Sequence, residues 1–214
     1  MAEAAVGSQT LNENNAKSLF AVLALNAAAF YLVEHAMAIT VGDWIALATG
    51  WMSALPAGVG VVLTGILNAQ IGDELKARMV FLRWRFPYPG SEAFSRYGPR
   101  DPRVDMAALS TAFGPLPTER KEQNALWYRL YRTIASHPVI EHVHRKFLFA
   151  RDYSFISLIL VVILGAAAAV TMPIKTAAIY VIVLVLQWAL ATRAANVSGH
   201  RFVTTVLAQK GAGN

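Results

Sequence analysis

Two long apolar segments, residues 18–67 and 153–192, constrain the fold of this 214-residue chain more than any other feature. Each is long enough for two helical crossings of a bilayer, because a hydrocarbon core of about 30 Å needs roughly 20 helical residues. Only Gly42-Asp43 and the turn around Pro173 interrupt the two segments, so each is expected to form an antiparallel hairpin. The sequence therefore predicts an all-α membrane protein with four transmembrane helices in two hairpins that bracket a helical cytoplasmic domain.

The four predicted spans are Ser18–Val41, Trp44–Leu67, Tyr153–Met172 and Ile174–Thr192. The composition agrees with a membrane protein, since 56 % of the residues are hydrophobic and the mean hydropathy is +0.42. The N-terminus lacks the short apolar core and cleavage site of a signal peptide, so the first span is expected in the mature protein. The chain has no cysteine, which excludes disulfides and thiolate metal sites.

The distribution of positive charge predicts the orientation. Residues 73–152 hold 14 of the 19 Lys and Arg, which favours a cytoplasmic location for this part and, with four spans, for both termini. A bacterial inner membrane is the expected setting. The predicted parts are a cytoplasmic N-terminal tail (1–17), hairpin 1 (18–67), a basic helical cytoplasmic domain (68–152), hairpin 2 (153–192) and a cytoplasmic C-terminal amphipathic tail (193–214).

Helix signals divide the central domain into segments. Proline and glycine end helices, and Asp or Thr before a helix caps its free amides. These rules predict one helix over Ile66–Phe86, a loop over Ser91–Arg100, a helix from Asp101-Pro102 to Phe113, a helix capped by Thr118 that reaches about Ser136, and one long helix over Val139–Met172. The tail after the fourth span is expected to continue as a helix along the membrane surface.

Five arginines of the central domain lie far along the chain from the predicted spans: Arg96, Arg100, Arg103, Arg129 and Arg132. Their planar guanidinium groups suit phosphate and carboxylate. We predict that they bind an anionic ligand such as a nucleotide, or an acidic cytosolic protein partner. The alternative is that they belong to the positive-inside signal and attract anionic lipid, as is expected of the arginines that flank the spans.

Polar residues inside the first span form a second candidate site. Glu34 and His35 are adjacent, and an ionisable group at membrane depth is costly and therefore a functional candidate. The alternative is that a protonated or paired Glu34 fixes helix packing. Asn26, deeper in the same span, is expected to make an interhelical hydrogen bond.

The second span is interrupted by proline and glycine. Pro56, Gly58 and Gly60 are candidate gating or pore-lining positions, because such a helix can kink or expose carbonyls to a cavity. Close helix packing is the ordinary explanation, and Gly50, Ala54 and Gly58 have the four-residue spacing of a helix contact within one chain or between copies.

Aromatic and histidine residues near position 130 have simpler explanations than a ligand site. Trp127, Leu130, Tyr131 and Ile134 recur at helical spacing, so a buried stripe is favoured over base stacking. His142 and His144 project to nearly opposite sides of a helix, which argues against a metal site. No phosphate loop, zinc helix or nucleophile elbow is present, so no catalytic residue, cofactor or sequence-specific nucleic-acid binding is predicted.

The leading functional hypothesis is an oligomeric inner-membrane protein whose cytoplasmic domain senses a signal or partner and whose spans form a pore or perturb the membrane. Small size supports oligomerisation, because four spans leave a monomer little room for an aqueous path. The layout is similar, at the level of architecture, to small bacterial membrane effectors of anti-phage defence systems. Two alternatives stay open: a membrane-anchored scaffold that recruits a cytosolic partner, and an intramembrane enzyme or transporter subunit that uses Glu34 and His35.

Overall fold

The computed structural model describes residues 2–36, 45 and 55–213, with residues 2–14, 55–57 and 61 described by their backbone alone. The chain is 84 % helix, and no strand occurs in these residues, which confirms the predicted all-helical fold. It divides into two compact units. The polar unit comprises Met1–Asn15, Asp73–Arg151 and Thr192–Asn214, and the apolar unit comprises Ala16–Gly72 and Asp152–Ala191.

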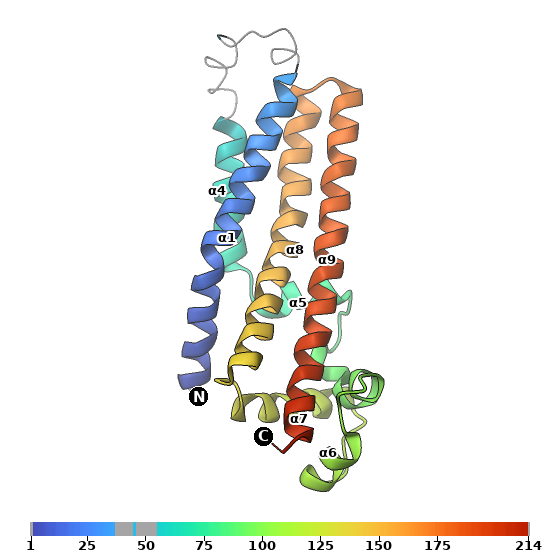
Figure 1. Ribbon diagram of the computed structural model, residues 1–214. Helices are drawn as coiled ribbons and strands as arrows, with labels where there is room; N and C mark the ends of the chain where they lie inside the picture. Colours follow the sequence, from blue (N-terminus) through green and yellow to red (C-terminus); the bar gives the residue numbers. More distant parts are fainter. Residues whose placement is uncertain (1, 37–44, 46–54, 214) are drawn as a thin grey trace. The chain divides into compact units, whose positions relative to one another are not determined.

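The apolar unit is a bundle of four helical segments. They belong to α1 (Ala2–Glu34), α4 (Leu55–Gln70), α8 (Pro138–Thr171) and α9 (Ile174–Gly211), which lie side by side in Figure 1. Phe30 of α1 packs edge-on against Tyr180 of α9, with ring centroids 5.7 Å apart. Gly60 of α4 lies against Ile163 of α8. These contacts show that segments far apart in the sequence form one packed unit.

Three helices of the described part are long and apolar enough to cross a membrane: the Asn15–Glu34 part of α1, α8 and α9. Large apolar side chains such as Leu25, Val170 and Ile179 are exposed on the apolar unit, whereas Leu160 and Leu164 fill its centre. Helices that are apolar on both the inner and the outer face are typical of a membrane protein. The predicted second span falls partly on residues 46–54, outside the described residues, as do Gly50 and Ala54; α4 is its described part.

Short helices pack around the C-terminal part of α9 in the polar unit (Figure 1). They are α5 (Asp73–Phe81), the 3-10 turn η2 (Pro89–Glu92), the π turn η3 (Ala93–Tyr97), the 3-10 turn η4 (Gly98–Arg100), α6 (Met106–Phe113) and α7 (Arg120–Thr133). Trp127, Leu130 and Tyr131 of α7 are buried in the core, which confirms the predicted apolar stripe.

The prediction of one helix over Ile66–Phe86 is wrong. α4 ends at Gln70 and α5 begins at Asp73, with Ile71 and Gly72 between them. Glycine is a poor helix former, and Asp73 and Glu74 stabilise the positive N-terminal end of a new helix. The absence of proline, on which the prediction rested, was therefore not sufficient.

Three further boundaries differ from the prediction. Residues 89–100 form successive tight helical turns instead of a loop. α6 begins at Met106, because Asp105 and not Asp101 caps it by accepting a hydrogen bond from the Ala108 amide at 2.8 Å. α7 follows Glu119 and ends at Thr133, so neither the cap at Thr118 nor the end near Ser136 is correct.

The C-terminal segment is helical to Gly211, as predicted, but most of its large apolar side chains are not available to a membrane surface. Phe202, Val203, Val206 and Leu207 are buried in the core of the polar unit. The Trp127 indole donates a hydrogen bond to the Val203 carbonyl at 3.4 Å. The apolar stripe of this segment therefore packs on protein.

Candidate functional site

A pocket of about 580 Å³ lies in the polar unit between the turns before α6 and the C-terminal part of α9. The turns η3 and η4 and the residues after them contribute one wall, and the other comes from α9, where Val197, His200, Arg201 and Thr204 have the spacing of one helix face. The residues around the pocket are Arg96, Tyr97, Arg100, Asp101, Pro102, Arg103, Val197, His200, Arg201 and Thr204. Four of these ten residues are arginines.

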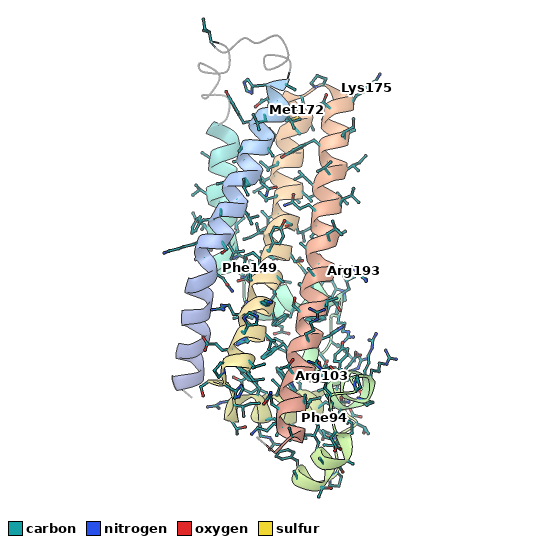
Figure 2. All side chains as sticks on the ribbon, viewed as in Figure 1. Phe94, Arg103, Phe149, Met172, Lys175 and Arg193 are labelled. Atoms are coloured by element: carbon teal, nitrogen blue, oxygen red, sulfur yellow. The ribbon has the colours of Figure 1, made fainter. Side chains whose placement is uncertain are left out.

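Arg103, labelled in Figure 2, lines the pocket and contacts α9 through Thr204. Its Nε and Nη2 donate to the two carboxylate oxygens of Asp101 at 2.9 and 2.7 Å, and Nη2 also donates to Thr204 Oγ1 at 3.2 Å. The hydrogen bonds from Arg103 hold the pKa of Asp101 well below its usual range. The carboxylate of Asp101 is therefore ionised and neutralised by Arg103, so it opposes anion entry only weakly.

A buried carboxylate, Glu92, organises the arginines beside the pocket. Its Oε2 accepts hydrogen bonds from Arg83 at 2.6 Å and Arg96 at 3.0 Å, and its Oε1 accepts from Arg120 at 3.0 Å. Burial by itself raises the pKa of Glu92, but the hydrogen bonds from Arg83 and Arg96 outweigh it and the pKa is lowered. Glu92 thus fixes Arg96 at the pocket while the charge of the cluster stays positive.

His200 lies on the pocket wall and packs against Tyr97 with the two rings tilted and their centroids 4.2 Å apart. Burial, and then the positive charges of Arg96 and Arg83, lower the pKa of His200. The ring is therefore neutral at pH 7, and the cationic character of the pocket comes from its arginines.

Arg100 and Arg201 are the cations that the protein leaves available. Both are exposed at the pocket, and within the described part of the chain neither has a recorded ion pair or hydrogen bond. A guanidinium group presents several donors in one plane, which suits the oxygens of phosphate or carboxylate. An anion can therefore bind to these two arginines without breaking an ion pair or a hydrogen bond within the described part of the protein.

Three of the five predicted anion-binding arginines, Arg96, Arg100 and Arg103, come together at this pocket. Arg129 and Arg132 do not line it. Both are exposed on α7, because the helix turns its stripe of Trp127 toward the core and leaves them on the solvent side. Their predicted role in binding an anion or an acidic partner is therefore separate from this pocket and stays a prediction.

Sequence reasoning missed Glu92, His200, Arg201 and Thr204 as members of this site. The signal for the three α9 residues was the helical spacing of positions 197, 200, 201 and 204, which becomes meaningful once the helix is known to continue past the apolar stretch. The local signal for Glu92 was Arg96, four residues further along the chain. The other two arginine partners, Arg83 and Arg120, are 9 and 28 residues away and reach Glu92 only through the fold.

The candidate residues of the first span are only partly brought together. Glu34 Oε2 is buried and has no hydrogen-bond partner among the described residues, and it lies 4.0 Å from His35 Nδ1. That nitrogen is 3.1 Å from the Tyr31 carbonyl, and the two rings stack. Asn26 donates to the Val22 carbonyl of its own helix at 2.9 Å, so the expected interhelical hydrogen bond is not the one observed.

The glycines of the second span differ from each other. A Cβ at Gly60 would lie 2.6 Å from Ile163 Cγ2, so Gly60 permits close approach of α4 and α8. A Cβ at Gly58 would meet nothing within 4 Å. The side chain of Pro56 lies outside the described side chains. Gly60 therefore fits the packing alternative better than a gating role.

The three histidines near position 140 separate, as their spacing indicated. His144 packs against Phe202 and lies within 3.1 Å of the Tyr131 hydroxyl, whereas His137 and His142 are exposed. In the residues that the structure describes, no group of three His, Cys, Asp or Glu side chains is placed to hold a metal ion.

Comparison with known proteins found no relative of this chain. No family model, curated protein or solved structure matches the chain.

Proposed function

We propose that this protein is an oligomeric inner-membrane protein that senses an anionic signal at the pocket of Arg96, Arg100, Arg103 and Arg201. In this proposal four spans form two hairpins, the polar unit and both termini are cytoplasmic, and the spans respond by opening a pore or perturbing the bilayer. An effector role in anti-phage defence is one use of such a device, proposed from its layout alone.

The observation that carries the proposal is the pair of exposed arginines, Arg100 and Arg201, on opposite walls of one pocket. The pocket volume of about 580 Å³ is within the range of small-molecule sites in proteins. Arg96 and Arg103 are held in place by Glu92 and Asp101, so the wall of the pocket to which they belong is formed before a ligand arrives. A phosphorylated small molecule fits this combination of size and charge.

The helix α9 supplies the basis for a response. Its first half is apolar enough to cross a membrane, and its last third carries His200, Arg201 and Thr204 of the pocket. A ligand that contacts Arg201 therefore acts on the same helix that contributes a span. Apolar side chains exposed on the apolar unit supply area for contacts with lipid and with further copies of the chain.

Dye leakage tests the proposal. Full-length protein in liposomes is exposed to inorganic phosphate, pyrophosphate and ATP, and the expected result is leakage with at least one of them. The double variant Arg100→Ala/Arg201→Ala is expected to abolish the response, while Arg129→Ala/Arg132→Ala, which removes the same charge from α7, is expected to preserve it. Tight vesicles under every condition, or equal effects of the two double variants, would contradict the proposal.

The exposed face of α7 favours a second candidate, the membrane-anchored scaffold. Arg129, Arg132 and Tyr128 are exposed on this helix and lie outside the pocket. Arginine and tyrosine are enriched at protein interfaces. If Arg129→Glu abolishes capture of a cytosolic partner while Arg100→Ala/Arg201→Ala leaves all activity intact, the scaffold replaces the sensor.

A further inference from the structure

The segment of residues 82–88, which joins α5 to the turn η2, exposes large apolar side chains in the polar unit. Leu82 is 77 % exposed, Trp84 78 % and Phe86 42 %. An exposed tryptophan next to two exposed aliphatic or aromatic residues is costly in water and is typical of an interaction site. The pocket and the arginine sensor do not include these residues.

The backbone holds these side chains outward in a fixed conformation. Leu82 and Phe86 have φ angles of 50° and 51°, in the left-handed region that bulky residues seldom adopt. Between them, Arg83 turns inward, where its side chain donates to Glu92 at 2.6 Å and its amide donates to the Arg78 carbonyl at 3.2 Å. Strained residues that persist because their surroundings fix them are often functional.

The second end of the segment is also anchored. Ser91 Oγ donates to the Phe86 and Tyr88 carbonyls at 3.0 and 2.7 Å. Pro87 is buried, and a Cβ at Gly90 would lie 2.6 Å from the Trp127 ring, so the backbone is seated on the core. The exposed tip of Leu82, Trp84 and Phe86 is therefore a preformed projection.

Charge indicates what the tip contacts. Among the cations of residues 75–91, Arg78 pairs with Glu74, Arg83 pairs with Glu92 and Lys76 is buried, which leaves Arg85 to be considered at the tip. Arg85, between Trp84 and Phe86, is exposed and has no ion pair or hydrogen bond recorded in the described residues. Tryptophan prefers the boundary between hydrocarbon and headgroups, and arginine near it attracts anionic lipid.

The chain itself limits how far the tip is from α4, the described part of the expected second span. Two residues and the nine-residue α5 connect Gln70 to Leu82. At 3.8 Å for each extended step and 1.5 Å for each helical step, the two Cα atoms are at most about 27 Å apart. A segment tethered this closely to a membrane helix can reach the lipid surface.

We propose that Leu82, Trp84 and Phe86 insert into the interfacial region of an anionic lipid bilayer, with Arg85 on the phosphate groups. In this proposal the polar unit binds the membrane surface, while the apolar unit is surrounded by lipid. This inference is independent of the anion pocket.

Spin labelling tests it on the full-length chain, which contains no native cysteine. Tyr88→Cys carries a nitroxide next to the tip, and Tyr128→Cys carries the same label on α7, where the native tyrosine is also exposed, at 47 %. The protein is placed in nanodiscs of phosphatidylcholine with or without phosphatidylglycerol. Collision of each label with oxygen, which concentrates in lipid, and with a water-soluble nickel chelate is then measured.

The expected result is that the label at position 88 collides preferentially with oxygen when phosphatidylglycerol is present, while the label at 128 collides with the nickel chelate. Trp84→Ser is expected to return the label at 88 to water, and Arg85→Ala to lower the ratio of lipid-exposed to water-exposed label by about fivefold, the value of one charge near an anionic surface. Both residues are exposed, so these variants spare the core.

Two results would overturn the inference. One is a label at 88 that remains accessible to the nickel chelate in both lipid mixtures. The other is protection of that label from both reagents that increases with protein concentration, because the tip then contacts a second chain instead of lipid.

Discussion

Glu92 is the buried carboxylate on which Arg83, Arg96 and Arg120 converge. Removing its charge leaves Arg83, which is only 18 % exposed, without its counter-ion. Removing one partner of a buried pair is strongly destabilising. Two of the three arginines are half exposed, so we expect Glu92→Gln to lower the free energy of unfolding of the polar unit by about 3 kcal/mol, the lower end of that range.

Denaturant titration of detergent-solubilised protein, followed by near-UV circular dichroism of the core aromatics, measures this change. Glu122→Gln on α7 is the matched control, because Glu122 is exposed and has no recorded ion pair in the described part of the chain. Equal stability of Glu92→Gln and Glu122→Gln would show that the arginine cluster does not depend on Glu92.

Acid sensitivity follows from the same carboxylates. The pKa of Asp101 is lowered by its hydrogen bonds from Arg103, and the pKa of Glu92 is lowered because those from Arg83 and Arg96 outweigh burial. A group whose folded pKa is depressed stabilises the protein above its unfolded pKa and loses that contribution as the pH falls toward the folded pKa. Stability is therefore expected to decrease below the ordinary pKa values of 4.5 and 3.8 of these two carboxylates. A separate decrease is expected as the pH falls below 6.5, because burial lowers the pKa of His144 to about 4 and also lowers the pKa of His200.

The variant Asp101→Asn isolates one part of that pH dependence. It removes the titrating group while it keeps the size of the side chain, so its unfolding free energy is expected to decrease less steeply below pH 4 than that of the wild type. Unfolding curves collected from pH 7 to pH 2.5 provide the measurement. An unchanged acid slope in Asp101→Asn would mean that the Arg103 pair contributes nothing to stability.

At the scale of single helices, Gly58 and Gly60 of α4 form a natural pair for comparison. Alanine at position 60 would place its Cβ 2.6 Å from Ile163 Cγ2, a methyl group on a branched carbon that cannot move aside without shifting α8. Overpacking of this kind typically costs about 1–3 kcal/mol. Alanine at position 58 meets nothing within 4 Å and is expected to be neutral or slightly stabilising, since alanine is the better helix former.

Thermal unfolding of Gly60→Ala and Gly58→Ala in the same detergent distinguishes the two positions. A lower midpoint is expected for Gly60→Ala alone. A loss of stability at Gly58 of the same size would instead place a helix contact, within the chain or between copies, at that position.

The helix boundaries show which parts of the fold local sequence rules predict correctly. The long helix predicted over Val139–Met172 is observed as Pro138–Thr171, because proline suits the first helical turn and the apolar run that follows has no interruption. The start of α6 was misplaced, because both Asp101 and Asp105 carry a capping side chain. Asp101 instead accepts hydrogen bonds from Arg103, two residues further along the chain, and Asp105 caps the helix.

The arginine pocket depends even more on tertiary structure. Arg96, Arg100 and Arg103 could be predicted as a group because they lie close together in the sequence. Their partner Thr204 is 101 residues from Arg103, and the burial of Phe202 and Val203 in the same core places that part of α9 beside them. The helical spacing of positions 197, 200, 201 and 204 groups the α9 residues on one face, but only the fold shows that this face, and not Arg129, lies at the pocket.

On the scale of the whole molecule, the chain combines an apolar unit, which contains helices long and apolar enough to cross a membrane, with a polar unit that carries an arginine-lined pocket. The chain has a net charge of +6, yet most of its arginines near the pocket are already paired with Glu92 or Asp101. Binding therefore rests on the two unpaired side chains, Arg100 and Arg201. A hydrogen bond to a charged group contributes about 1.5–3 kcal/mol, so each arginine is expected to account for roughly tenfold or more in affinity.

Isothermal titration calorimetry of the full-length protein in nanodiscs tests this claim most directly. Pyrophosphate and ATP are titrated into the wild type, Arg100→Ala/Arg201→Ala and Arg129→Ala/Arg132→Ala at equal ionic strength. The account predicts saturable binding of at least one of them, weakened by roughly a hundredfold in Arg100→Ala/Arg201→Ala and unchanged in the α7 variant. Absence of binding to the wild type, or equal weakening in both double variants, would contradict it.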